Sequence, residues 1–238
     1  MSSFTLAWNF LIFGVLPYVV IAVLILGSLA RFVLAPFSWK SQSSEILDKK
    51  DIFWGANLFH IGVIFLFCGH CFGLFTPTEW LNAAGLTPRL HQMMEIICGG
   101  LSAIVAITGL IILTWRRLTN ERVRAASRPS DFWVLFLLLA VIILGIGCVV
   151  NSYLYDKSGA TIILLGGWVR GLFSFDYQAW QNILLVPDWQ KGHIFVGLII
   201  FLIVPFTRLV HIWSGYLSVF YLIRPHQIMR ANNGKPMK

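Results

Sequence analysis

Five long apolar segments constrain the fold of this 238-residue chain more than any other feature of the sequence. They cover residues 6–30, 53–75, 93–115, 132–150 and 193–213. An α-helix rises about 1.5 Å per residue, so about 20 apolar residues cross the roughly 30 Å hydrocarbon core of a bilayer. The sequence therefore predicts an all-α integral membrane bundle of five transmembrane helices, which residues 1–238 form as one domain.

The composition agrees with a membrane protein and excludes other classes. Charged residues make up only 12% of the chain and the mean hydropathy is +0.77, whereas a soluble domain carries about twice that share of charge. The net charge of +8 is compatible with nucleic-acid binding. However, the basic residues lie in short loops between apolar segments, where they set membrane topology. We therefore expect membrane lipid around the chain and no nucleic acid as a partner.

The distribution of Lys and Arg predicts how the chain is oriented. Thirteen of these residues lie in the first and third loops and the C-terminal tail, whereas the N-terminus and the other two loops hold four. By the positive-inside rule, the N-terminus lies outside (periplasmic) and the C-terminus inside (cytoplasmic). We expect a multi-pass protein of the cytoplasmic (inner) membrane. In the outer fourth loop, the aromatic segment 167–186 predicts either a short interfacial helix or an irregular loop.

Four of the six histidines lie within or at the ends of the second and fifth apolar segments: His60, His70, His193 and His211. Ionisable residues are costly in a bilayer and usually face the bundle interior. Because the two predicted helices are antiparallel, His60 lies at the level of His211 on the inner side, and His70 at the level of His193 on the outer side. On a continuous fifth helix His193 and His211 share one face, but their axial separation exceeds that of His60 and His70 by about 12 Å, which requires tilt or staggered ligation.

Two histidines on facing helices can bind one haem iron from both sides, and two such pairs form a path for electrons across the membrane. Structural zinc needs four ligands, and no third or fourth ligand completes either pair. Glycines at 62, 69 and 73 share a helix face that admits either a neighbouring helix or a flat macrocycle. The pattern alone leaves open structural histidines or a proton relay in a channel or transporter, although five spans without paired halves are atypical of transporters.

Several short motifs stand out around the histidines and in the loops. They are residues 39–40, 43–50, 57–62 (Asn-Leu-Phe-His-Ile-Gly), 69–70, 72–73, 122–125 and 205–213 (Pro-Phe-Thr-Arg-Leu-Val-His-Ile-Trp). Together with the histidine spacings of ten and eighteen residues, they make the chain resemble the gamma subunit of respiratory nitrate reductase, a membrane cytochrome b. The resemblance covers nearly the whole chain and is weakest in the fourth loop and the tail.

The resemblance implies two haem b groups. Carried over residue by residue, His60 and His211 would ligate the inner, proximal haem iron, and His70 and His193 the outer, distal one. It also implies that quinol (menaquinol or ubiquinol) is oxidised near the outer haem. Electrons would then pass to an iron–sulfur subunit and a molybdenum catalytic subunit on the cytoplasmic side, which reduces nitrate. The chain would be the quinol-oxidising electron-transfer subunit of this oxidoreductase, without a nitrate-reducing site. The alternative is a cytochrome b of another molybdenum or sulfur-reducing complex.

Two further residues are candidates for the site. His91, at the outer end of the third segment, occupies a position where the resemblance leads us to expect Lys. It is either the proton acceptor for quinol or an exposed loop histidine without a role. Arg117, at the inner end of the same segment, is the preferred partner for a haem propionate, since Arg forms bidentate pairs with carboxylates. The alternative for Arg117 is a topogenic charge.

Overall fold

A computed structural model describes residues 3–35, 38 and 49–213, and these residues form helices and no strand. Within them, five helices are long and apolar enough to cross a membrane: Ser3–Leu34, Ile52–Phe75, Pro88–Thr119, Pro129–Tyr155 and Asp188–Phe206. The prediction of five spans is confirmed. Most helices extend several residues beyond the predicted segments, because polar residues continue the helix past its apolar part.

The first and third spans are each interrupted by a π-turn, and short helices connect the spans. The elements in chain order are α1 (Ser3–Phe10), η1 (Leu11–Val15), α2 (Leu16–Leu34), α3 (Lys49–Phe75), α4 (Thr78–Ala83), α5 (Pro88–Met94), η4 (Glu95–Gly99), α6 (Gly100–Thr119), α7 (Glu121–Ala125), α8 (Pro129–Tyr155), α9 (Ala160–Phe173), η5 (Ala179–Leu185), α10 (Asp188–Ile203), η6 (Val204–Phe206) and η7 (Arg208–Val210).

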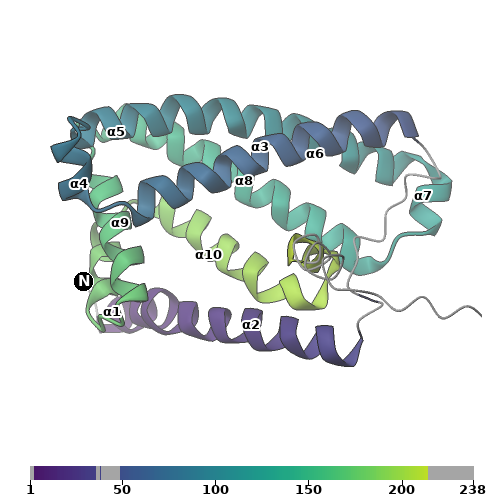
Figure 1. The fold of residues 1–238 in the computed structure, drawn as a ribbon, viewed down its shortest axis with the longest axis horizontal. Helices are drawn as coiled ribbons and strands as arrows, with labels where there is room; N and C mark the ends of the chain where they lie inside the picture. The colour runs from purple at the N-terminus through teal and green to yellow at the C-terminus, as the bar shows by residue number, and fades with distance from the viewer. Residues whose placement is uncertain (1–2, 36–37, 39–48, 214–238) are drawn as a thin grey trace, which may run out of the picture.

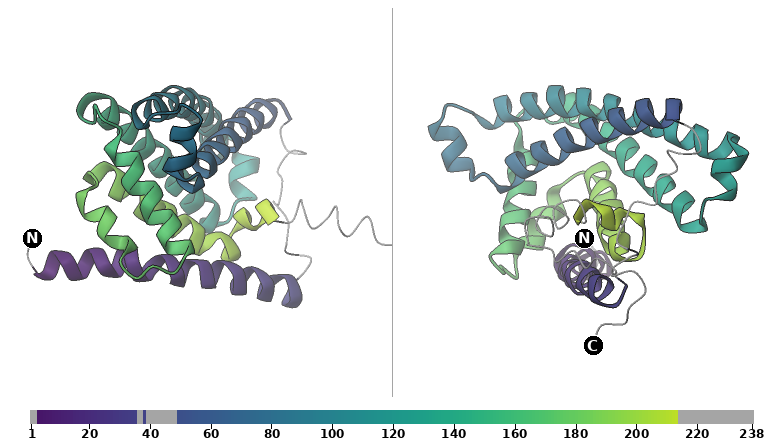
Figure 2. Two further views of the ribbon diagram at one scale, coloured as in Figure 1. Left: turned by 60° about the vertical axis from the view of Figure 1, so that its left-hand side comes forward. Right: turned by 45° about the vertical axis from the view of Figure 1, so that its right-hand side comes forward.

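The long helices run along the long axis of the molecule (Figure 1). The N-terminus, α4 and α9 lie at one end, which we call the N-terminal end, and α7 lies at the opposite end, the α7 end. The long helices contact one another in a row: α3 packs against α6, α6 against α8, α8 against α10, and α10 against α2. Figure 2 shows α1–η1–α2 running along one side of this arrangement. The helices therefore form a continuous series in which α3 and α10 are not close-packed neighbours.

Glycine permits the close packing of α3 on α6. A Cβ atom on Gly62 would lie 2.5 Å from the backbone nitrogen of Ala106, and one on Gly109 would clash with the backbone of Phe59. Small residues at these positions let two membrane helices approach to backbone contact. For Gly62, the helix-packing alternative is the correct one.

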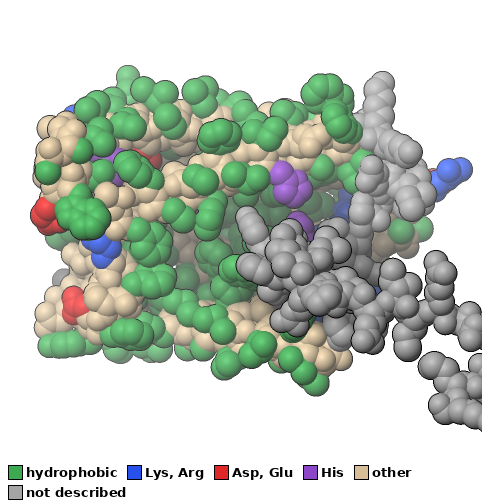
Figure 3. Space-filling model, in the orientation of Figure 1, with side chains coloured by type: hydrophobic (Ala, Val, Ile, Leu, Met, Phe, Trp, Pro, Cys, Tyr) green, Lys and Arg blue, Asp and Glu red, His purple; other side chains and the backbone are tan. Residues whose placement is uncertain are grey.

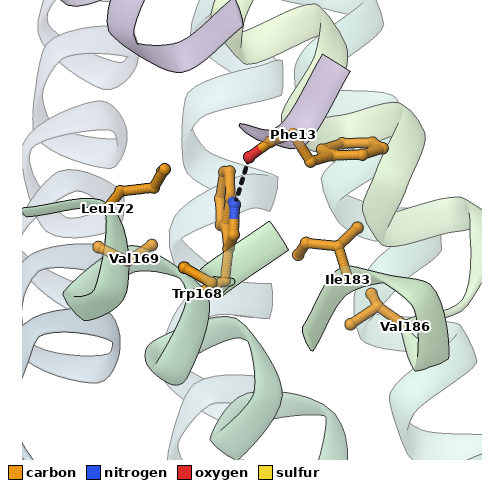
Figure 4. Close-up of a cluster of buried hydrophobic side chains, with 7 residues drawn as sticks. Phe13, Trp168, Val169, Leu172, Ile183 and Val186 are labelled. Atoms are coloured by element: carbon orange, nitrogen blue, oxygen red, sulfur yellow. Dashed lines mark hydrogen bonds between the residues drawn. The ribbon is translucent and has the colours of Figure 1, made fainter. Parts of the chain in front are cut away.

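The fourth loop is mostly helical and belongs to a protein core. Trp168 on α9 is buried, and its Nε1–H donates to the carbonyl of Phe13 at 2.8 Å. Ile183 and Val186 pack in the same cluster (Figure 4). Of the two alternatives for residues 167–186, the irregular loop is wrong, because this segment continues α9, which begins at Ala160, and then forms η5. The position of this helical segment at the membrane interface stays a prediction. Phe175 and Tyr177 remain exposed.

The fifth span departs most from the prediction. Helix α10 begins at Asp188 and ends at Ile203, so residues 193–213 are not one helix. Pro205 has no N–H to continue the helix, and Thr207 adopts an extended backbone between the short turns η6 and η7. His211 follows this break. The prediction that His193 and His211 share a face of one continuous helix is therefore wrong.

Candidate functional site

The structure brings the four histidines together in two pairs. The ring centroids of His60 and His211 lie 6.1 Å apart, and those of His70 and His193 lie 6.0 Å apart. Figure 3 shows histidine side chains (purple) on one face of the molecule, among apolar side chains. On a continuous fifth helix, His193 and His211 would lie farther apart along the axis than His60 and His70. The break before His211 removes this difference, so both pairs can form. The pairing expected from the sequence is therefore present in space, although the predicted helix geometry behind it was incorrect.

Each of these histidines is fixed through the same ring nitrogen. Nδ1 lies 2.7 Å from a backbone carbonyl oxygen in His60, His70 and His211, and 2.9 Å in His193. The partners are the carbonyls of Ala56, Leu66, Arg208 and Val141, respectively. A carbonyl only accepts, so Nδ1 carries the hydrogen and Nε2 keeps its lone pair. This is the arrangement of metal-binding histidines, whose second nitrogen is oriented by a hydrogen bond.

The pairs fit a haem iron better than a bare metal ion. Two imidazoles on opposite sides of a metal, with metal–nitrogen bonds of about 2 Å, have ring centroids roughly 6 Å apart. Among the described residues, no group of three or more His, Cys, Asp or Glu could hold a metal ion. Each pair therefore offers two ligands, and a porphyrin is the kind of group that supplies the remaining four to its own iron.

Glycines near the outer pair leave room around its rings. A Cβ atom on Gly69, next to His70, would meet no atom within 4 Å. A Cβ atom on Gly145 of α8 would lie 3.1 Å from the ring of His193. Gly69 thus fits the macrocycle alternative of the sequence analysis, whereas Gly62 serves helix packing. The neighbouring Cys68 and Cys71 lie within α3 and are free.

A pocket lies at the N-terminal end beside His91. It is lined by Gly73, Thr76, Thr78, Leu81, Leu86, Pro88, His91, Ile162, Ile163 and Arg170. His91 is only 6% exposed, so the alternative of an exposed loop histidine is wrong. Its Nε2 would lie 3.3 Å from a Cβ on Gly73, and its ring meets that of Phe72 edge-on. Since Phe72 and Gly73 closely follow His70 in α3, the pocket adjoins the outer histidine pair.

Two polar residues, Arg170 and Gln92, lie at and beside this pocket and were not predicted from the sequence. Arg170 donates through Nη1 to the carbonyls of Leu74 and Thr76, at the end of α3. Gln92 is 1% exposed and donates to the carbonyl of Asp156 at 2.9 Å. A polar residue at the edge of an apolar segment was the available signal for Gln92. The contact of Arg170 with α3 has no local sequence signal, because the two are far apart in the chain.

A buried ion-pair network lies at the α7 end. Asp131 of α8 accepts from Arg208 Nε at 2.7 Å and from Arg117 Nη1 at 3.1 Å. The same Nη1 of Arg117 also donates to the hydroxyl of Ser127. Arg117, which the sequence predicts as the partner of a haem propionate, is therefore already paired with a carboxylate of the protein. Asp131 was not predicted from the sequence.

Five apolar spans and two pairs of imidazoles at two levels define a helical membrane protein whose side chains can hold two groups by bis-histidine ligation. The chain belongs to the nitrate reductase gamma subunit family, since the model of that family matches residues 9–232. It is thus a member of a family of oxidoreductase subunits.

Similar proteins cover nearly the same length. The chain is 35% identical to the respiratory nitrate reductase 2 gamma chain of Escherichia coli strain K12, over 94% of this chain and 97% of that one. It is 35% identical to the nitrate reductase gamma chain of Bacillus subtilis strain 168, over 94% and 98%, respectively. It is also 28% identical to the nitrate reductase-like protein NarX of Mycobacterium tuberculosis, over 93% of this chain and 34% of that longer protein.

Proposed function

We propose that this chain is the cytochrome b subunit of a membrane-bound nitrate reductase. It would oxidise quinol at the N-terminal end and deliver electrons at the α7 end. The observation that carries the proposal is the shared geometry of the four histidines: two rings about 6 Å apart in each pair, with every Nδ1 bonded to a carbonyl. Family membership supports the same assignment.

In this proposal His60 and His211 hold the inner haem, and His70 and His193 hold the outer haem. The backbone carbonyls keep each Nε2 available and fix the orientation of each ring. When bound, the haem irons supply reversible one-electron transfer between the two ends of the molecule. Arg117 neutralises a propionate of the inner haem while it remains paired with Asp131.

The pocket beside His91 is the proposed site of quinol oxidation. His91 is buried, its Nε2 faces Gly73, and its ring nitrogens can take up a proton from a quinol hydroxyl. Apolar residues such as Leu81 and Ile162 line the same pocket and can contact the ring of a quinol. The pocket includes Gly73, three residues after His70 in α3, which supports a quinol site close to the outer haem.

The proposed orientation puts the N-terminal end outside and the α7 end in the cytoplasm of a bacterial inner membrane. Seven arginines of the described residues lie at the α7 end or in its loops: Arg31, Arg116, Arg117, Arg122, Arg124, Arg128 and Arg208. We propose that this end docks the iron–sulfur subunit, through which electrons reach the molybdenum subunit. The basic residues of the C-terminal tail, which the sequence analysis counts on the same side, lie in residues 214–238, outside the part of the chain that the structure describes.

A proton relay through the histidines is less consistent with their bonding. A relay histidine must accept a proton on one ring nitrogen and release it from the other. In all four paired histidines Nδ1–H is held by a carbonyl oxygen, which cannot exchange the proton onward. The bonding pattern therefore favours ligation over proton transfer.

Single histidine variants test the proposal. His60→Ala or His211→Ala should abolish the inner haem signal in the reduced-minus-oxidised spectrum, and His70→Ala or His193→Ala the outer one. His91→Ala is the matched control, since it removes a buried histidine from the same bundle and should leave both signals intact. Spectra in which the four variants still show both haem signals would contradict the assignment of the ligands.

A further inference from the structure

Of the four paired histidines, His211 is the one whose carbonyl partner does not belong to a long helix. His60 and His70 bond to carbonyls four residues earlier in α3, and His193 bonds to Val141 in α8. His211 instead bonds to the carbonyl of Arg208, in the short turn η7. The regular backbone of α3 and α8 fixes three rings, so another device must fix the fourth.

Arg31, at the end of α2, holds the first half of the break. Its Nη1 donates to the carbonyls of Pro205 and Thr207, both at 2.7 Å. Nε and Nη2 of the same guanidinium donate to the hydroxyl and the carbonyl of Ser38. The break frees carbonyls from helical bonding, and one rigid cation satisfies two of them, since guanidinium donors have a fixed fork geometry.

Gly27, one turn before Arg31 in α2, allows this contact. A Cβ atom on Gly27 would lie 3.0 Å from Cβ of Pro205, closer than side chains normally approach. In α2, Gly27 therefore leaves the space in which Pro205 packs, and Arg31 donates hydrogen bonds to the carbonyls beside it. The first span thus contacts the fifth at the point where the fifth stops being a helix.

Asp131 holds the second half of the break. Its side chain is almost fully buried, and Oδ1 accepts from Nε of Arg208 at 2.7 Å. Oδ2 accepts from Arg117 Nη1 and from the backbone N–H of Arg128. Three donors hold this buried carboxylate in place, because each lost hydrogen bond would leave part of a buried charge unsatisfied. The residue so held, Arg208, is the one whose carbonyl bonds to His211.

We propose that Arg31 and Asp131 are positioning residues for the inner haem, which clamp residues 205–208 from two sides and thereby orient the ring of His211. The inference rests on the proposed function, since it assumes that His60 and His211 ligate that haem. The hydrogen bonds of Arg31 and Asp131 to residues 205–208 reach the carbonyls of Pro205 and Thr207 and the side chain of Arg208. Replacing Arg31 or Asp131 should alter the inner haem. It should leave the outer haem unchanged, because carbonyls of the regular helices α3 and α8 fix the rings of His70 and His193.

The test compares the spectra and midpoint potentials of both haems in variants purified from membranes. Arg31→Leu and Asp131→Asn should shift the absorption band and potential of the inner haem, or lose that haem, without changing the outer one. Arg31→Lys and Asp131→Glu keep the charge and should restore part of the unaltered signal. Glu121→Gln is the matched control, because it removes an exposed carboxylate at the same end of the molecule. His211→Ala, measured in parallel, identifies the inner haem signal.

The outcomes separate this inference from the proposed function. If His211→Ala removes one haem signal while Arg31→Leu and Asp131→Asn match the unaltered protein, the clamp is wrong and the ligand assignment stands. If the unaltered protein holds no haem, the proposed function itself fails. If Asp131→Asn does not accumulate in membranes, the comparison of Arg31→Leu with Arg31→Lys decides. An equal shift of both haems in Arg31→Leu would overturn the clamp, because general loosening of the bundle would explain it.

Discussion

At the scale of single residues, the hydrogen bonds of Nδ1 decide what the histidines can do. A histidine in a bilayer span that lacks such a bond can change tautomer and pass a proton, whereas one whose Nδ1–H is held by a carbonyl presents Nε2 as a ligand. His60, His70, His193 and His211 all belong to the second kind. His91 differs from them, since its side chain lines the pocket at the N-terminal end.

His91 should therefore act as a base in the quinol reaction. Replacing it with alanine should lower the rate of quinol oxidation by roughly 100-fold, the usual contribution of a positioned base. The pH dependence of the rate should also change, because the side chain that takes up the proton from quinol is gone. The measurement is a quinol-analogue assay across pH, with dithionite reduction as proof that both haems remain.

His91→Gln separates proton uptake from positioning. Glutamine keeps a hydrogen-bonding side chain of similar reach but takes up no proton, so its rate should fall with that of His91→Ala. A rate and a pH profile equal to those of the unaltered protein in both variants would return His91 to a packing role.

Among the candidate residues, the sequence predicted which histidines lie in pairs, but not the residues that support them. Four histidines at two depths in antiparallel spans leave few other pairings, because helix rise fixes their levels. Arg31, Asp131 and Arg170 act through contacts with carbonyls and side chains far away in the chain. Such contacts depend on the packing of the spans, which no local pattern encodes.

At the scale of elements, the start of α9 depends on one carboxylate. Asp156 Oδ1 accepts from the backbone N–H groups of Ser158, Gly159 and Ala160, and Oδ2 accepts from that of Thr161. Burial alone would raise the pKa of Asp156, but these hydrogen bonds, led by that of Thr161, outweigh it and lower the pKa to about 2. The carboxylate also carries the negative charge that a helix N-terminus favours.

The cap of α9 should make the stability of the N-terminal end depend on pH. Because the folded pKa lies below the ordinary value of 3.8, the stabilisation is complete above about pH 4 and is lost as the pH falls towards 2. Asp156→Ala should lower the free energy of unfolding by about 1 kcal/mol at neutral pH and reduce its acid sensitivity. Thermal unfolding in detergent at pH 7 measures the first effect, and its change between pH 5 and pH 2.5 measures the second.

Asp176→Ala is the control for this cap, since the exposed Asp176 accepts a single backbone N–H, that of Gln178. It should leave the acid dependence of the unaltered protein in place. Equal acid sensitivity in Asp156→Ala and the unaltered protein would show that the capping carboxylate does not govern it.

The elements also show where sequence patterns stop being informative. Apolar length predicted every span, because a bilayer requires it. It did not predict the end of α10 at Ile203, because residues 204–213 are still largely apolar and their composition gives no sign that the helix has ended. Pro205 was the local signal for that break. The residue type of Trp168 likewise did not predict its hydrogen bond to the carbonyl of Phe13, which belongs to the first span.

At the scale of the whole molecule, the arrangement gives the electron path its direction. The pocket beside His91 lies at the N-terminal end, and the pair His60 and His211 lies nearer to the arginine-rich α7 end. If the N-terminal end faces outward, protons from quinol are released outside while electrons move inward. Charge then crosses the membrane although no protein group carries a proton through it.

The orientation can be tested with tags at the two termini. A tag after Lys238 should resist protease in intact spheroplasts and be cleaved in inverted vesicles, because the positive-inside rule puts this end in the cytoplasm. A tag before Met1 should behave in the opposite way and serves as the internal control. Cleavage of the C-terminal tag in sealed spheroplasts would reverse the orientation and the side of proton release.

The haem content of the purified chain tests the central claim most directly. Two histidine pairs that each fit one haem iron predict a ratio of two haem b groups to one chain, measured as haem after extraction against protein by amino-acid analysis. A ratio near two, with two resolved midpoint potentials, is the result that this account predicts. A ratio near one, or a chain that accumulates in membranes without haem, would contradict it.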